Sequence, residues 1–183
     1  YLSVEIDTIR EYSPRKDIPV TTNFMGRFYG IDYRVLAKKI DAISWDSYPA
    51  FHNDYESYAD TMLSAAFDNA IMRSMKKDKP FLLMESAPGL VNWMQYNKLK
   101  RPGVHEQFAM QTIACGSDSV QYFQIRKSRG AAEQFHGALI DHIGTNDTRI
   151  YKEVAKTGET LAKLAEVEGS LKRNDAAIIF EWD

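Results

Sequence analysis

The sequence contains little cysteine and no long apolar run, and these absences exclude several classes of protein. Its 183 residues include a single cysteine, Cys115, so neither a disulfide framework nor a cysteine-based zinc site can form within the chain. No apolar run approaches the roughly 18 residues of a transmembrane helix, and we expect no membrane partner. The formal net charge of −2 and the pI of about 6.1 give no reason to expect a nucleic-acid partner either.

Motifs for nucleotide binding and for secretion are also absent. The sequence has neither a G-x-G-x-x-G nor a Walker A motif, which disfavours a nucleotide-binding open sheet. Tyr1 opens no signal-peptide pattern. It is not an initiator methionine, and it lies within a segment with a helical pattern. We therefore expect an internal segment of a longer protein, for which a cytoplasmic location is our starting hypothesis.

What the sequence does contain is a regular alternation of helical and strand patterns. The longest helical pattern covers 58–76 (YADTMLSAAFDNAIMRSMK) and is followed by a short apolar run, FLLME, at 81–85. Such alternation predicts an α/β fold with a parallel sheet. The predicted helices cover 1–12, 32–39, 58–76, 104–116 and 148–169, and the predicted strands cover 18–23, 43–49, 81–85, 119–126 and 176–182.

The four main predicted strands end in polar or aromatic residues rather than in a glycine-rich phosphate loop. In a (β/α)8 TIM barrel, the catalytic residues lie at the C-terminal ends of several strands. We therefore predict part of such a barrel. A polar stretch at 168–175 (EGSLKRND) follows the last helix and marks a candidate domain boundary. The strand endings are Thr22-Asn23, Asp46-Ser47-Tyr48, Glu85-Ser86 and Gln124-Arg126.

Glu85 is the strongest candidate for chemistry. It directly follows four apolar residues, where a carboxylate is costly unless it has partners or a role. The residues alone leave two interpretations open: a solvated or salt-bridged strand-end glutamate, or an ionised nucleophile aimed at an anomeric carbon. Asp46 also has two interpretations. It either lines a pocket or satisfies backbone groups of a turn, as aspartate near a proline commonly does. Tyr48 either lines a pocket or packs.

Further candidates lie in the segments that follow the last two main strands. Trp93 either stacks on a sugar ring or packs within its loop. Glu133 and His136, in Glu-x-x-His spacing, would share one side of a helical turn. This spacing also resembles metal-ligand pairs of di-iron bundles, but those need a second pair from other helices. We therefore favour hydrogen bonding to sugar hydroxyls, with no metal and no cofactor, and expect Arg126 to neutralise and orient nearby carboxylates.

Three motifs, taken together and in order, resemble the glycoside hydrolase family 42 β-galactosidases. They are WDSYP at 45–49, FLLMESAPGLVNW at 81–93 and RKSRGAAEQFHGA at 126–138. The resemblance runs over nearly the whole chain. It implies a retaining glycosidase that hydrolyses terminal β-D-galactosyl residues by double displacement.

The same resemblance implies roles for individual residues. Glu85 corresponds to the family's nucleophile, at the end of the seventh barrel strand. Trp93 corresponds to a tryptophan that contacts substrate, and Glu133 and His136 correspond to residues that bind galactose hydroxyls. A galactoside substrate and a homo-oligomer, which is a trimer in the family, are implied as well.

The sequence departs from the family pattern at the acid/base residue. The family's acid/base glutamate lies in an Asn-Glu pair at the end of the fourth strand, and no Asn-Glu dipeptide occurs here. The family's metal-binding cysteine cluster is also missing. By the order of elements, residues 1–170 correspond to strands five to eight with their helices. Residues 171–183 then correspond to a linker and the first strand of a following trimerisation-type domain.

We therefore expect a fragment of a retaining β-galactosidase that is inactive by itself. Two alternatives stay open at this point. One is a non-catalytic half-barrel with residual sugar binding, and the other is a fragment of another retaining barrel glycosidase.

Overall fold

The chain folds into a four-stranded parallel sheet with helices, as the computed structural model shows for residues 1–51 and 53–181. Along the sheet the strands follow the order β1-β2-β3-β4. The strands are β1 Asn23–Phe24, β2 Ser44–Asp46, β3 Phe81–Glu85 and β4 Ser117–Val120. The α-helices are α1 Leu2–Tyr12, α2 Tyr33–Ala37, α3 Tyr58–Ser74, α4 Val104–Ala114 and α5 Arg149–Ala162, and the 3-10 helices are η1 Ala132–Phe135 and η2 Ala165–Val167.

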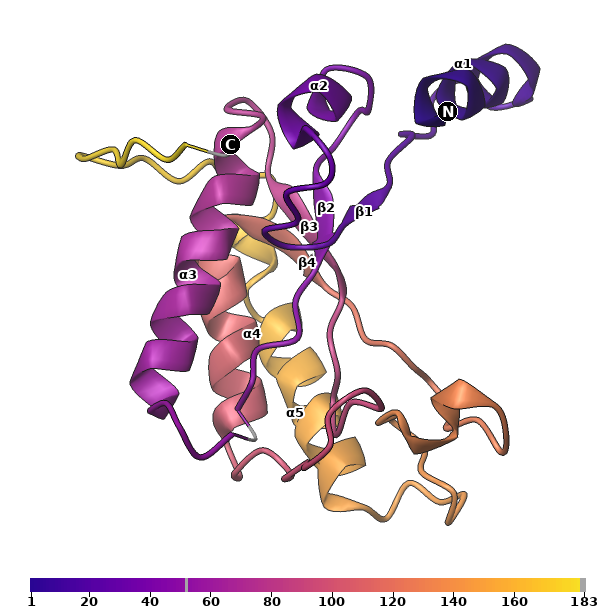
Figure 1. Cartoon of the computed structure of the whole chain (residues 1–183), viewed down its shortest axis with the longest axis vertical. Coiled ribbons are helices and arrows are strands. Elements are labelled where there is room, and N and C mark those ends of the chain that lie inside the picture. The colour runs from indigo at the N-terminus through magenta and orange to yellow at the C-terminus, as the bar shows by residue number, and fades with distance from the viewer. Residues whose placement is uncertain (52, 182–183) are drawn as a thin grey trace.

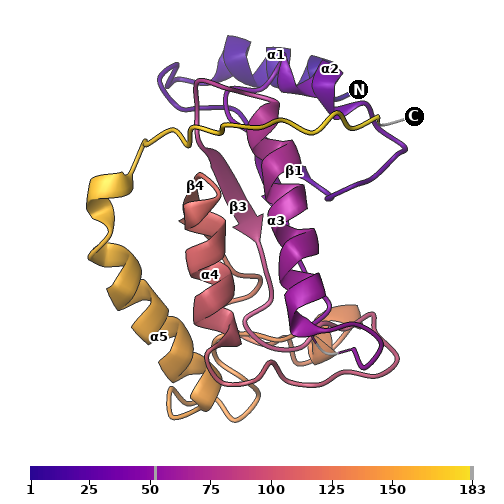
Figure 2. The ribbon, with the colours of Figure 1, turned by 90° about the vertical axis from the view of Figure 1, so that its left-hand side faces the viewer.

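The long helices cover one face of the sheet. Figures 1 and 2 show α3, α4 and α5 side by side along it, with α4 in contact with both of the others. The loops that follow β3 and β4 gather at the opposite end of the molecule from α1 and α2. Strand, helix and strand thus alternate with parallel pairing, which confirms the predicted α/β fold and its class as a partial TIM barrel.

The core lies between the sheet and the long helices. Along β3 the side chains alternate, so that Phe81 and Leu83 are buried against the helices. They pack in one cluster with Trp45 of β2, Met72 of α3 and Phe108 of α4. The apolar residues of the strands thus form the core, and the polar residues that follow β2 and β3 lie at the ends of these strands.

Helix α3 begins at the predicted residue, Tyr58, and ends at Ser74, shortly before the predicted end at residue 76. Ser57 and Asp60 form a capping box, in which the Ser57 hydroxyl accepts the Asp60 N–H and the Asp60 carboxylate accepts the Ser57 N–H. Ala65 and Met72 lie on the buried face of the helix. The helix ends at Ser74, a few residues before Pro80 and the start of β3.

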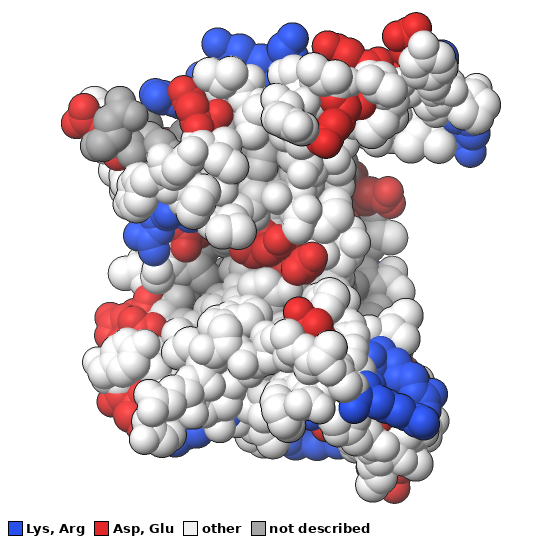
Figure 3. All heavy atoms as spheres, turned by 45° about the vertical axis from the view of Figure 1, so that its right-hand side comes forward, with Lys and Arg blue, Asp and Glu red and all other residues white. Residues whose placement is uncertain are grey.

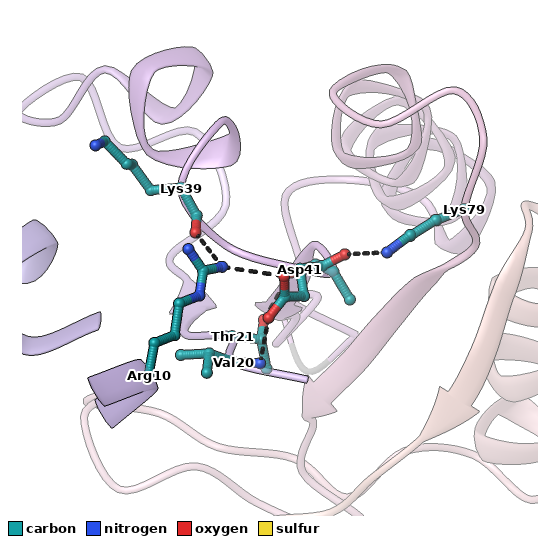
Figure 4. Close-up of polar contacts among 7 residues, drawn as sticks. Arg10, Val20, Thr21, Lys39, Asp41 and Lys79 are labelled. Atoms are coloured by element: carbon teal, nitrogen blue, oxygen red, sulfur yellow. Dashed lines mark hydrogen bonds and ion pairs between the residues drawn. The ribbon is translucent and has the colours of Figure 1, made fainter. Parts of the chain in front are cut away.

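A polar network joins the segments that precede three of the strands (Figure 4). The Asp41 carboxylate accepts the Val20 N–H at 2.7 Å and pairs with Arg10 of α1 at 3.0 Å. The Lys79 ammonium donates to the Asp41 carbonyl oxygen at 3.0 Å. The bond from Val20, supported by Arg10 and Lys79, lowers the pKa of Asp41 below its usual value. This network lies at the N-terminal edge of the sheet. In a TIM barrel, residues at this end contribute to stability, whereas the catalytic residues lie at the other end.

Three of the predicted strands have other bounds in the structure. The strand expected over 43–49 is confined to Ser44–Asp46. The strand expected over 18–23 is confined to Asn23–Phe24, because the Val20 N–H is bound by Asp41 and not by a neighbouring strand. The strand expected over 119–126 begins earlier and ends at Val120. Beyond it the chain still donates to the neighbouring segment, from the Phe123 N–H to the Ser86 carbonyl at 3.0 Å, but without a regular ladder.

The C-terminal predictions are also partly wrong. The helix expected over 148–169 stops at Ala162 and is followed by the short η2, whereas the other helices end within two residues of their predicted ends. No strand forms over 176–181, and Trp182 lies outside the described residues. No neighbouring strand pairs with this segment in the described part of the chain, and the Phe180 ring packs on Phe67 of α3 with centroids 5.4 Å apart.

Candidate active site

A register shift in the sheet places two carboxylates side by side. Trp45 pairs with Leu83, but the next residue of β2, Asp46, pairs with Glu85, so β3 carries one extra residue at this point. The Ser47 N–H then donates to the Glu85 carbonyl at 2.9 Å. The two strand-end carboxylates singled out in the sequence therefore lie at adjacent positions of the same sheet edge.

Glu85 is held through both of its carboxylate oxygens. The Tyr48 hydroxyl donates to Oε2 at 2.7 Å, and the Asn23 amide donates to Oε1 at 3.5 Å. The same amide nitrogen donates to Oδ2 of Asp46 at 2.6 Å. The ends of β1, β2 and β3 thus contribute to one network, which is how a barrel assembles a site from several strands.

Burial is the main cause of the shifted pKa values of Tyr48 and Asp46 in this network. Burial, followed by the hydrogen bond to Glu85 and the charges of the nearby carboxylates, raises the pKa of Tyr48 above its usual value. Tyr48 therefore stays protonated and remains a donor to Glu85. Burial also raises the pKa of Asp46 to about 6, although the bond from Asn23 opposes the shift, and the charge of Glu85 adds to it.

Aromatic rings form a wall beside Glu85. His136 is buried, and its ring lies 5.8 Å from Tyr48, 5.6 Å from Trp93 and 4.9 Å from Phe123, measured between centroids. The Trp93 and Tyr48 rings meet edge to face at 5.0 Å. Trp93 is 57% exposed, so one large apolar surface next to the carboxylates remains open to a ligand.

His136 and Glu133 leave polar atoms available at this wall. The His136 Nδ1 lies 3.0 Å from the Gly137 carbonyl oxygen, which can only accept, so Nδ1 carries the proton in the neutral ring. Its Nε2 is then an acceptor, and it is buried without a hydrogen-bond partner in the described residues. Glu133 accepts a hydrogen bond from the Asn92 amide at 3.2 Å.

The partly buried Lys100 side chain holds the loop that carries Trp93. The Lys100 ammonium donates to the Ala87 carbonyl at 2.8 Å and to the Gly89 carbonyl at 3.1 Å. Burial lowers the pKa of Lys100 to about 8. The Gly137 N–H also donates to the Leu90 carbonyl at 2.7 Å, which ties the segment after β4 to this loop.

Substitution of Gly137 tests how closely these two segments must approach. A Cβ at Gly137 would lie 2.6 Å from the Leu90 nitrogen and 2.7 Å from its oxygen. We expect Gly137→Ala to destabilise the folded protein by about 1–3 kcal/mol, measured as a lower urea midpoint of the full-length protein. Gly130→Ala is the matched control, because its Cβ would meet no atom within 4 Å. Equal midpoints for the two variants would contradict the close approach.

The structure brings most of the predicted residues together, with one exception. Glu85, Asp46, Tyr48, Trp93 and His136 form one connected group, and Glu133 joins its edge through the charge it exerts on Tyr48. Arg126 is exposed and makes a bridge with Ile140. It forms no ion pair with a carboxylate in the part of the chain that the structure describes, so it does not orient this group.

Three further residues belong to the site although sequence reasoning assigned them no role. They are Asn23, Asn92 and Phe123. Asn23 could have been found from its place at a strand end, but Asn92 and Phe123 carry no distinguishing pattern. Over residues 1–51 and 53–181, no group of three or more His, Cys, Asp or Glu side chains could hold a metal ion.

Charged side chains of both signs lie on the face shown in Figure 3. One group of acidic side chains lies near the middle of this face and one group of Lys and Arg side chains lies toward its lower edge, with further charges of both signs along the top. No helix in the described residues is long and apolar enough to cross a membrane.

Comparison with known proteins extends this description. A profile of glycoside hydrolase family 42, described as β-galactosidase, matches residues 1–164. The β-galactosidases GalA of Bacillus licheniformis and GanA of Bacillus subtilis are each 50% identical over 185 residues, covering 98% of this chain and 27% of their own length. A catalytic mutant of Gan42B, a family 42 β-galactosidase from G. stearothermophilus, matches with a TM-score of 0.94 at 48% identity, covering 99% of this chain and 27% of its own.

The partial TIM barrel, with polar and aromatic side chains gathered at its strand ends, and the match to the family model place the chain in the class of barrel glycoside hydrolases. Within that class, the chain belongs to the glycoside hydrolase family 42 β-galactosidases. It spans about a quarter of the length of the curated relatives it matches.

Proposed function

We propose that this chain is the part of a retaining β-galactosidase that supplies the catalytic nucleophile, Glu85, and one wall of the galactose site. The observation that carries the proposal is the position of Glu85. It ends a barrel strand, is held by Tyr48 at 2.7 Å, and lies beside the open ring of Trp93. The similar proteins GalA and GanA are β-galactosidases, and a galactoside is the substrate we propose.

In this mechanism Glu85 attacks the anomeric carbon of the galactosyl residue. One carboxylate oxygen forms a bond to that carbon while the bond to the leaving oxygen breaks, and water later releases galactose with retention. The short bond from Tyr48 occupies Oε2, so Oε1, with its longer contact to Asn23, is the oxygen that attacks. Tyr48 then holds the other oxygen in both the carboxylate and the ester form.

The neighbouring side chains bind the sugar. Trp93 offers its exposed ring to the apolar face of galactose. The free Nε2 of His136 accepts a hydrogen bond from a hydroxyl group, and Glu133, steadied by Asn92, accepts from another. Because a neutral sugar needs acceptors and an apolar platform rather than a cation, these groups suit it.

The acid/base residue is proposed to lie outside this chain. A retaining glycosidase needs a second carboxyl group about 5–5.5 Å from the nucleophile. Asp46 is bound to the same Asn23 amide as Glu85, on the nucleophile's own side of the site. Residues 171–183 are proposed to lead into a following domain, and the full-length protein to form a homo-oligomer, a trimer by resemblance, in the cytoplasm.

A mechanism-based label tests the nucleophile directly. The full-length protein is incubated with a 2-deoxy-2-fluoro-galactoside that carries an activated leaving group, and its peptides are analysed by mass spectrometry. The fluorine slows both steps and the leaving group restores the first, so the glycosyl ester accumulates. We expect the adduct on the peptide that contains Glu85. An adduct on any other residue would refute the assignment.

A further inference from the structure

One amide nitrogen contacts both carboxylates of the site. The Asn23 side-chain nitrogen carries two hydrogens, and it lies 2.6 Å from Oδ2 of Asp46 and 3.5 Å from Oε1 of Glu85. The first contact is short and the second is at the limit of a hydrogen bond. Asp46 therefore holds the amide, and the amide reaches Glu85.

Asp46 is placed as an anchor with one bonded and one unbonded oxygen. Its Oδ1 is buried and has no hydrogen-bond partner in the described residues. The Asp46 residue also lines a cavity of about 250 Å³ between the end of β2 and α3. The titratable or charged groups that face Asp46 or line this cavity are Glu85, Tyr48, Tyr33, Glu56 and Asp68, the last paired with Arg27.

We propose that Asn23 is a positioning residue for the attack by Glu85 and that Asp46 is the anchor that holds Asn23 in place. The inference rests on the proposed function of Glu85 as nucleophile. An attacking oxygen must be aimed, and a displacement of about 1 Å can cost on the order of 100-fold in rate. Oε1 has Asn23 as its only side-chain donor in the described residues, so this amide sets its direction.

The anchor also adds a charge that depends on pH. With a pKa of about 6, Asp46 is neutral in acid and negative above that pH. The negative form stabilises the positive charge that develops at the anomeric carbon. In Asp46→Asn the charge is absent at every pH, while a carbonyl oxygen remains to accept from Asn23. The ratio of wild-type to Asp46→Asn rates should therefore rise with pH, with a midpoint near 6.

The test measures the rate at which the 2-fluoro-galactoside labels the full-length protein. Asn23→Ala should lower this rate by about 10- to 100-fold, while the dissociation constant for galactose changes by less than about twofold. Asp46→Ala should give a similar loss, and the double variant no further loss, because the two residues act as one unit. Asp46→Asn should keep most of the rate below pH 6.

The outcomes separate the two proposals. Asn174→Ala and Asp54→Asn are controls, since they change an exposed amide and an exposed carboxylate elsewhere and should label at the wild-type rate. Wild-type labelling of Asn23→Ala, multiplying losses in the double variant, or a pH-independent ratio for Asp46→Asn would each overturn the inference. A wild-type protein labelled on a residue other than Glu85 would instead overturn the proposed function.

Discussion

Replacing Glu85 with alanine in the full-length protein should lower kcat for galactoside hydrolysis by at least about 10⁴-fold. The variant loses the group that forms the covalent intermediate, whereas the sugar-binding wall of Trp93 and His136 remains. Galactose affinity should therefore change little, and the loss should appear in kcat. Steady-state kinetics with an aryl galactoside measures this, and Glu168→Ala, an exposed glutamate far along the chain, is the matched control.

Rescue with azide distinguishes the nucleophile from an acid/base residue. Removal of a nucleophile leaves space on the face opposite the leaving group, so azide attacks there and forms an α-galactosyl azide by a single inversion. Removal of an acid/base residue would leave the covalent intermediate intact, and azide would then form the β-galactosyl azide. We expect Glu85→Ala to give the α product, identified by nuclear magnetic resonance. The β product would show that Glu85 is the acid/base instead.

The apolar pattern of the sequence predicts the α/β architecture well. The strands that it predicts wrongly have physical explanations. The short apolar run FLLME at 81–85 comes after a long helical pattern and a proline, and this alternation made both the strand and helix α3 predictable. The full strand over 18–23 was not, because the Val20 N–H donates to the side chain of Asp41, 21 residues away in the sequence, and not to a neighbouring strand. The strand predicted over 176–182 does not form over 176–181, which has no pairing partner among the described residues.

The candidate site was predictable at the level of residues and not of geometry. A carboxylate after a buried strand makes Glu85 a candidate from sequence alone, and the resemblance of the motif that includes Trp93 favours its role as nucleophile. The adjacency of Asp46 and Glu85 depends on a one-residue register shift that no sequence pattern reveals. The bridging role of Asn23 follows from that shift, because only adjacent carboxylates can share one amide. Arg126 was expected near the carboxylates because it follows the last main strand in the sequence, but in the described structure it forms no ion pair with them.

The isolated chain of 183 residues should show no turnover of ordinary galactosides under conditions where the full-length protein is active. Loss of a proton donor for the leaving group alone costs about 10²–10⁴-fold. The sheet adds a second reason, because β1 and β4 are its outer strands and each leaves one backbone edge unpaired in the described structure. Unpaired edges promote association between chains.

We therefore expect the isolated chain to self-associate, as size-exclusion chromatography with light scattering would show. A dinitrophenyl galactoside gives the complementary measurement, since its leaving group needs no proton for the first step. If the chain retains the geometry around Glu85, this substrate should release a small burst of dinitrophenol that Glu85→Ala abolishes. A clean monomer would contradict the argument from strand edges, and steady turnover of an unactivated galactoside would place an acid/base residue within this chain.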